Sequence, residues 1–129
     1  MRDFCVLVVD DNNDMLDFMK KMFGLFKVKA DFVMSAAEAL ECLKNKDYRT
    51  MVTDLELPDM GGLELARRAR ELYPDLNVVL FTGNTSSYIQ KIAFDANVSE
   101  VHCIPSGLGR MLKSIIKREA DKDLYVKAT

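Results

Sequence analysis

The spacing of apolar residues changes repeatedly along this chain, and that alternation limits the folds open to it. Residues 4–9 form a continuous apolar run, which is typical of a strand buried on both faces. Between Asp14 and Phe26 the apolar residues recur every three or four positions, as they do in an amphipathic helix. The two patterns alternate as far as residue 121, so strands and helices are expected in turn.

Five segments have the strand pattern and five have the helical one. The predicted strands lie within residues 4–9, 28–34, 48–53, 77–81 and 100–104, and the predicted helices within 14–26, 35–46, 63–72, 86–96 and 106–121. Ser35 and Glu38 fit a capping box at the start of the second helix, and Asn97 suits a left-handed residue that ends the fourth. The short connections imply an α/β fold with a doubly wound, five-stranded parallel sheet and helices on both faces.

Length and composition suit a single soluble domain. The 129 residues are 49% hydrophobic and 29% charged, and we expect a domain over residues 1–121 followed by a fraying tail, 122–129. The formal net charge of −2 provides no basic surface for direct binding of nucleic acid. No apolar run approaches the roughly 18 residues of a membrane-spanning helix, so no membrane association is expected. Three isolated cysteines suit reduced thiols in a cytoplasmic protein.

Polar side chains follow three of the predicted strands at the point where each strand ends. Asp10 and Asp11 follow the first strand, Asp54 the third and Thr82 the fourth. Ligands of open α/β sheets bind beyond the carboxyl ends of the strands, so these residues are expected to meet. Bunched carboxylates raise the free energy of one another's ionised forms, and a divalent cation such as Mg²⁺ offsets that repulsion. We therefore expect these strand ends to bind Mg²⁺.

Several motifs resemble those of the receiver domain of two-component response regulators, including the single-domain chemotaxis regulators. They are Val8-Val9-Asp10-Asp11, the segment Asp54–Gly62 with Pro58 and Gly62 at the family spacing, Thr82-Gly83, and Pro105 after the fifth strand. The resemblance covers residues from about 4 to 120. It implies a flavodoxin-like fold with strand order 2-1-3-4-5 and a role in phosphorelay signal transduction.

The resemblance also assigns a role to each polar residue. It implies that Asp54 is the phosphoacceptor, and that Asp11, Asp54 and the backbone carbonyl of Glu56 ligate Mg²⁺ while Asp10 holds a metal-bound water. Thr82 would donate its hydroxyl to a phosphoryl oxygen, as the switch hydroxyl of the family. The phosphoryl donor would be a histidine kinase or a phosphotransfer domain. Output would be contact with a downstream protein that the sequence does not identify.

Three residues near the fifth strand depart from the family pattern. Ile104 stands where the family has a lysine that reaches a phosphoryl oxygen, a charge-assisted bond that contributes about 1.5–3 kcal/mol. Val101 replaces an aromatic residue that turns inward on activation, and Ser106 replaces a bulky residue. One consequence is a receiver that is still phosphorylated but has a modified switch, which the intact acidic set favours. The other is a degenerate receiver that binds a partner whatever its phosphorylation state.

Functions outside this family fit the sequence less well. Small phosphatases of the haloacid dehalogenase type use an aspartate nucleophile and Mg²⁺, but they need a second aspartate two residues later, where this chain has Glu56. The separate Asp10-Asp11 pair does not suit that scheme either, so no enzyme activity is expected. Taken alone, Asp10 and Asp11 would also suit the cap of a helix.

Two leucines of the first predicted helix and the single histidine complete the set of candidate residues. Leu16 and Leu25 lie off the main apolar stripe predicted for the first helix, which makes them candidates for a docking patch. His102 is the only histidine, and its strand neighbours favour a packed or surface position over a catalytic one.

Overall fold

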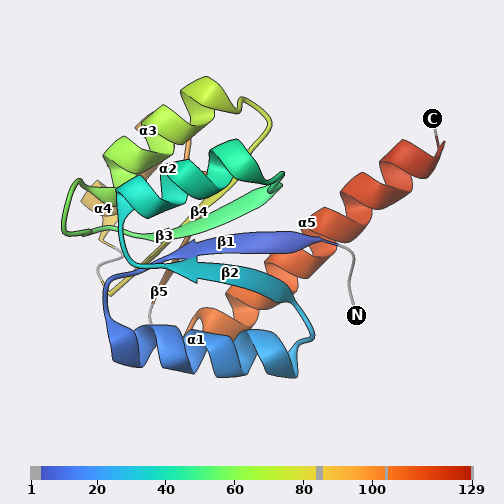
Figure 1. Cartoon of the computed structure of the whole chain (residues 1–129), viewed down its shortest axis with the longest axis horizontal. Helices are drawn as coiled ribbons and strands as arrows, with labels where there is room; N and C mark the ends of the chain where they lie inside the picture. The colour runs from blue at the N-terminus through green and yellow to red at the C-terminus, as the bar shows by residue number, and fades with distance from the viewer. Residues whose placement is uncertain (1–3, 84–85, 104, 129) are drawn as a thin grey trace.

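Strands and helices alternate along the computed structural model, which describes residues 4–83, 86–103 and 105–128 (Figure 1). The strands are β1 (Cys5–Val9), β2 (Lys29–Val33), β3 (Thr50–Asp54), β4 (Asn77–Thr82) and β5 (Glu100–Cys103). The helices are α1 (Asn13–Leu25), α2 (Ala36–Asn45), α3 (Gly62–Leu72), α4 (Ser87–Asp95) and α5 (Leu108–Ala128). The predicted α/β fold with five strands and five helices is confirmed.

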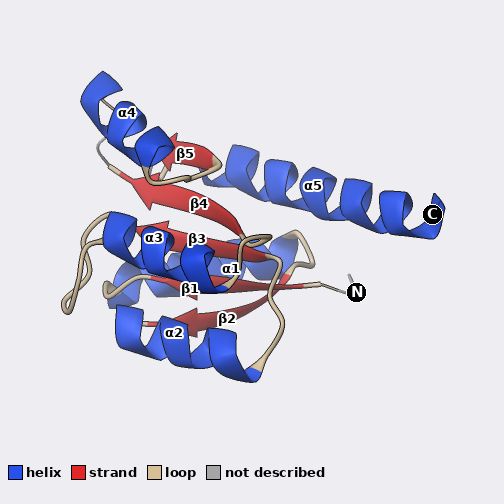
Figure 2. Cartoon of the chain, turned by 90° about the horizontal axis from the view of Figure 1, so that it is seen from above, coloured by secondary structure: helices blue, strands red, loops and turns tan. Residues whose placement is uncertain are grey.

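All of the strand pairs are parallel, and the strands lie in the order β2-β1-β3-β4-β5. This is the order that the family resemblance implied. Helices α2, α3 and α4 cover one face of the sheet, and α1 and α5 cover the other (Figures 1 and 2). Because every strand runs the same way, the carboxyl ends of β1, β3 and β4 lie along one edge.

The central strands have two buried faces, as their continuous apolar sequences predicted. In β1, Leu7 and Val9 pack into the core beneath α2, α3 and α4, whereas Val6 and Val8 pack beneath α1 and α5. All four side chains are at most 1% exposed. Each such burial contributes about 1.5–3 kcal/mol, so the edge that carries the polar residues rests on a rigid base.

The last helix is longer than the sequence pattern suggested. It was expected to end at about Asp121, but α5 continues to Ala128, so residues 122–128 of the expected tail are helical. The segment contains neither glycine nor proline, and nothing in it terminates a helix. The start also differs, because the Met111 amide donates to the Gly107 carbonyl at 2.9 Å and places Gly107, rather than Ser106, at the cap.

The buried stripe of α1 differs from the predicted one. Leu16, Met19 and Phe23 are its buried residues, so the prediction that Leu16 belongs to a docking patch is wrong. Leu25 is 75% exposed, and Phe18 is 38% exposed. This helix is apolar on more than one side, and the choice of its buried face depends on the sheet beneath it rather than on spacing.

Candidate functional site

The ends of β1 and β3 bring three carboxylates together. Val9 pairs with Thr53 across these neighbouring strands, so Asp10 and Asp54 follow at the same level of the sheet. Asp10 is buried, Asp54 is partly buried and Asp11 is exposed. One carboxylate oxygen from each residue lies within 4.8 Å of the other two. The structure therefore unites the three acidic residues that the sequence placed on separate segments.

Local hydrogen bonds orient two of these carboxylates. Oδ1 of Asp10 accepts from the Asn12 amide at 3.0 Å, and Oδ1 of Asp54 accepts from the Leu55 amide at 2.8 Å. Asn12 is itself the cap of α1, since its side chain accepts from the Met15 amide at 2.9 Å. The alternative in which Asp10 and Asp11 serve only as a helix cap is therefore wrong. An asparagine directly before a helix is a standard cap signal, and the sequence contained it.

Among the described residues, the charges that most affect Asp54 are negative. Burial, with the negative charges of Asp10, Asp11 and Glu56, raises the pKa of its carboxyl to about 6. Burial also raises the pKa of Asp10, with a further contribution from Asp11. A hard divalent cation, which prefers carboxylate oxygens, would offset this repulsion. The donor set thus fits a cation such as Mg²⁺.

The loop after Asp54 folds back onto the strand that carries it. The Gly62 amide donates to the Leu55 carbonyl at 2.7 Å, and Glu56 forms an isolated bridge with Gly61. A Cβ atom on Gly62 would lie 1.9 Å from the carbonyl oxygen of Asp54, so only glycine fits there. The first turn of α3 therefore lies against the backbone of Asp54, with Glu56 held two residues beyond it.

Thr82 lies at the carboxyl end of β4, beside the acidic strands. Asp54 pairs with Phe81 in the sheet, which places Thr82 one residue beyond that partner. Its side chain is buried at 4% exposure. The structure thus brings the predicted switch hydroxyl to the same edge as the carboxylates.

Comparison with known proteins agrees with this arrangement. The family model of the response regulator receiver domain matches residues 6–116. The chain belongs to this family. The response regulator receiver protein CpdR of Brucella abortus is 36% identical over 78 residues, which are 60% of this chain and 65% of CpdR. The hybrid signal transduction histidine kinase L of Dictyostelium discoideum is 30% identical over 121 residues, 88% of this chain but only 7% of the kinase.

A solved receiver structure shows the same fold. The CheY-like response regulator receiver domain protein of Methanospirillum hungatei JF-1 superposes with a TM-score of 0.84 at 24% identity, over 95% of this chain and 98% of that one. The chain is thus a receiver domain of two-component signalling with a flavodoxin-like fold. Among its described helices, none combines the length and apolar character that a bilayer-spanning segment requires.

Two of the three residues that depart from the family pattern lie within the described part of the chain. Val101 is partly buried and packs against the core beneath α2, α3 and α4. Ser106 is exposed after Pro105. Ile104, the residue in place of the family lysine, lies outside the described residues. Gly107 then leaves no room for a side chain, since a Cβ there would lie 2.6 Å from the Cys103 carbonyl oxygen.

A carboxylate of a different kind joins β5 to α5. Glu100 accepts hydrogen bonds from Ser114 at 2.7 Å and Arg118 at 2.8 Å, and its Oε1 lies 2.9 Å from Nε2 of His102. Burial alone would raise the pKa of Glu100, but these bonds outweigh it and hold the pKa below its usual value. The His102 side chain is only 10% exposed, so of the packed and surface positions considered for it the structure shows the packed one.

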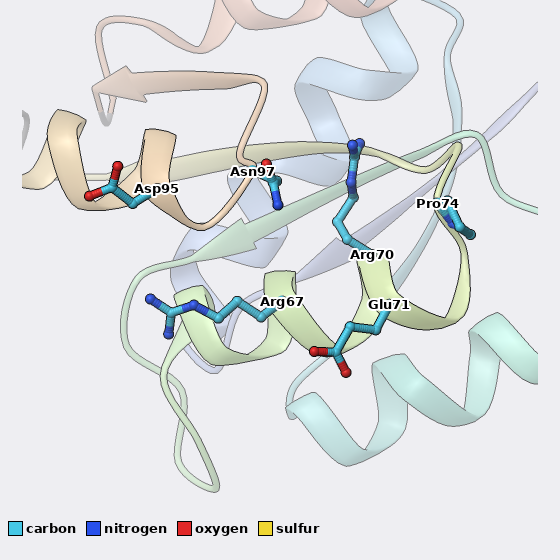
Figure 3. A pocket seen from close by; sticks show the side chains of 6 residues that line it. All are labelled: Arg67, Arg70, Glu71, Pro74, Asp95 and Asn97. Atoms are coloured by element: carbon cyan, nitrogen blue, oxygen red, sulfur yellow. The ribbon is translucent and has the colours of Figure 1, made fainter.

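A groove of about 350 Å³ separates the later turns of α3 and α4 (Figure 3). Its lining has mixed charge and consists of Arg67, Arg70, Glu71, Pro74, Asp95 and Asn97. Arg70 donates to the Leu76 carbonyl, which fixes the connection between α3 and β4. The groove lies toward the amino ends of β4 and β5, at the edge opposite to the acidic residues.

Proposed function

We propose that this receiver domain accepts a phosphoryl group on Asp54 from a histidine kinase or a phosphotransfer domain, in a reaction that depends on Mg²⁺. The observation that carries the proposal is the meeting of Asp10, Asp11 and Asp54, with one oxygen of each within 4.8 Å of the others. The burial and the like charges around Asp54 support the same conclusion, because they disfavour the metal-free ionised state. We place the protein in the cytoplasm, where such donors act.

Four residues would hold the metal. Asp11, Asp54 and the backbone carbonyl of Glu56 would ligate it directly, and Asp10 would hold one of its waters. Mg²⁺ bound there would neutralise the charge that develops on the phosphoryl oxygens. The bridge between Glu56 and Gly61 supports this assignment, since it fixes the backbone that carries the Glu56 carbonyl.

Asp54 would supply the nucleophile. Its pKa of about 6 leaves the carboxylate mostly ionised at neutral pH. A carboxylate oxygen attacks phosphorus, the bond between phosphorus and the donor's imidazole nitrogen breaks, and the donor imidazole keeps the electron pair. The Leu55 amide, which donates to Oδ1, limits rotation of the side chain. The hydroxyl of Thr82 would donate to an oxygen of the transferred group.

The departures at Ile104 and Val101 would change how firmly the phosphoryl group is held and how the domain responds to it, while the acceptor carboxylate itself is kept. Without the lysine ammonium the phosphorylated state would be held less strongly, and the small Val101 would change the switch of the β4–β5 region. We propose output through contact with a downstream protein. A degenerate receiver, which binds its partner regardless of phosphorylation, is the competing function.

Incubation with acetyl phosphate and Mg²⁺ tests the proposal. Intact-mass analysis should show one phosphoryl group per chain, and its peptide should contain Asp54. The Asp54→Asn variant should remain unmodified, and beryllofluoride with Mg²⁺ should raise the melting temperature of the wild type only. If the wild type gives neither an adduct nor a Mg²⁺-dependent shift, the degenerate receiver is the better description.

The phosphatase alternative has its own test. Glu56 occupies the position at which those enzymes place their acid/base aspartate, and its side chain is exposed. We expect no sustained turnover of p-nitrophenyl phosphate with Mg²⁺. Steady release of p-nitrophenol over many equivalents of protein, abolished by Asp54→Asn, would identify an enzyme instead.

A further inference from the structure

The tip of the loop between β3 and α3 is joined to the start of α2. Oδ1 of Asp59 accepts from the Ala36 amide at 2.9 Å, and Oδ2 accepts from the Ala37 amide at 2.8 Å. One carboxylate thus binds two successive amides of a helix that lies far from it in the sequence. In Figure 1 this loop lies beside the start of α2, at the edge of the sheet that carries the acidic residues.

Helix α2 already has a cap of its own. Oγ of Ser35 accepts from the Glu38 amide at 3.1 Å, and the Glu38 side chain reaches back to the Met34 amide at 3.2 Å. The amides of Ala36 and Ala37 are the ones that this local cap leaves over, and a helix N-terminus favours a negative charge. Asp59 therefore completes the cap of α2 from another segment.

The same loop is fixed at its base. The Gly62 amide closes it by donating to the Leu55 carbonyl, and Glu56 bridges Gly61. Between base and tip, Leu57 and Met60 are partly buried against the core beneath α2, α3 and α4. Asp59 is exposed, so its carboxylate is held by the two α2 amides rather than by packing. Among the described residues, the bonds of Asp59 attach the tip of this loop to α2.

We propose that Asp59 is a positioning residue, which holds the β3–α3 loop against α2 so that the Glu56 carbonyl keeps its place beside Asp54. This inference rests on the proposed function for its consequence, since it concerns the Mg²⁺ ligand that the loop would supply. It also makes α2 part of the site, because a shift of that helix moves the loop. Residues that support metal ligands in this way affect metal affinity without contacting the metal.

The test compares two caps of one helix. Asp59→Ala removes the attachment of the loop, whereas Ser35→Ala removes a cap bond from α2 but leaves the loop contact in place. Either change should lower the melting temperature of the protein by a similar amount, because each removes one acceptor from the start of α2. Mg²⁺ affinity, measured by calorimetry on the full chain, should fall on the order of tenfold in Asp59→Ala and stay within about twofold in Ser35→Ala. The Mg²⁺ affinity of Asp59→Asn, which keeps one acceptor oxygen, should lie between those of Asp59→Ala and Ser35→Ala.

A second readout needs no metal. In the metal-free protein, hydrogen exchange at the Gly62 amide should be faster in Asp59→Ala than in Ser35→Ala, because only the former releases the loop. Equal exchange and equal Mg²⁺ affinity in the two variants would overturn the positioning role. If the wild type binds no Mg²⁺ but the exchange difference remains, the proposed function fails while the coupling of loop and helix stands.

Discussion

Two carboxylate sites of this receiver domain have opposite electrostatic surroundings. At the ends of β1 and β3, burial and like charges raise the pKa of Asp54 to about 6. At the β5–α5 edge, bonds from Ser114, His102 and Arg118 hold the pKa of Glu100 below its usual value. Both groups are partly buried, so the difference comes from their partners rather than from depth.

The comparison distinguishes two kinds of carboxylate. The surroundings of Asp54 favour an added cation, whereas Glu100 receives its hydrogen bonds from the fold itself. Glu100 has donors from its own strand and from α5, and they link the edge strand to its covering helix. Asp54 accepts a hydrogen bond from the Leu55 amide, and the charges that raise its pKa belong to acidic residues. Carboxylates whose pKa values are raised by burial and like charges are concentrated at functional sites, where a bound cation or a reaction offsets the repulsion.

The largest effect is expected on Mg²⁺ affinity, when one of the carboxylates at the ends of β1 and β3 loses its charge. Asp11→Asn should lower Mg²⁺ affinity on the order of a hundredfold, because a charged oxygen ligand of a hard cation is lost. Titration calorimetry at pH 7.5 measures the change. Glu56→Gln is the matched control, since that residue acts through its backbone carbonyl, and its affinity should change less than about twofold. A similar loss in both variants would mean that only the overall charge of the edge matters.

Loss of the Glu100 carboxylate should lower the free energy of unfolding rather than the affinity for Mg²⁺. Glu100→Ala should lower the free energy of unfolding by about 2 kcal/mol, since hydrogen bonds to a partly buried carboxylate are lost. Chemical denaturation followed by circular dichroism measures it. Glu41→Ala removes an exposed ion pair to Lys44, with 4.0 Å between charged atoms, and should cost at most about 0.5 kcal/mol. Equal losses would show that the β5–α5 network is no stronger than a surface pair.

Acid should weaken metal binding at the first site. Because the pKa of Asp54 is about 6, its carboxylate is largely protonated at pH 5, and a proton competes with Mg²⁺ for it. Mg²⁺ affinity should therefore be about tenfold lower at pH 5.0 than at pH 7.5. The same titration on Asp54→Asn should be much less dependent on pH. An unchanged wild-type affinity would place Asp54 outside the coordination shell.

The smallest expected effect concerns the free energy of unfolding of the metal-free protein. The folded-state pKa of Asp54, about 6, lies above its ordinary value of 3.8, so ionisation destabilises the fold as pH rises through 6. After allowance for solvent screening, Asp54→Asn should be about 1 kcal/mol more stable than the wild type at pH 7.5. The difference should vanish near pH 4, where Asp54 is protonated. Urea denaturation in EDTA checks both values, and a less stable variant at pH 7.5 would contradict the repulsion.

The sequence predicted what depends on local pattern. Strands of continuous apolar residues and helices with regular spacing appear where expected, because two-sided burial and amphipathicity are both readable along the chain. The same is true of Asn97, whose φ of 62° is the left-handed conformation proposed for it. Asp10, Asp11, Asp54 and Thr82 could be placed at one edge, because strand ends in a parallel sheet share an edge.

What the sequence did not predict depends on contacts between distant segments. The bond of Asp59 to α2 has no local signal, since the loop and the helix are separate in the sequence and meet only in the folded chain. The Glu100 network likewise requires α5 to lie on β5. Lys27 takes a left-handed φ of 58° that its residue type does not favour, and the turn after α1 imposes it.

Gly62 contributes no functional group, yet the geometry beside Asp54 depends on it. A single added methyl group would collide with the acceptor residue's own backbone. Surveys that look for functional positions by neutralising charges or truncating side chains to alanine are designed to remove atoms, and here the damage comes from adding one. A receiver can therefore lose its chemistry with every carboxylate still in the sequence, and motif searches limited to acidic residues would count such a protein as intact.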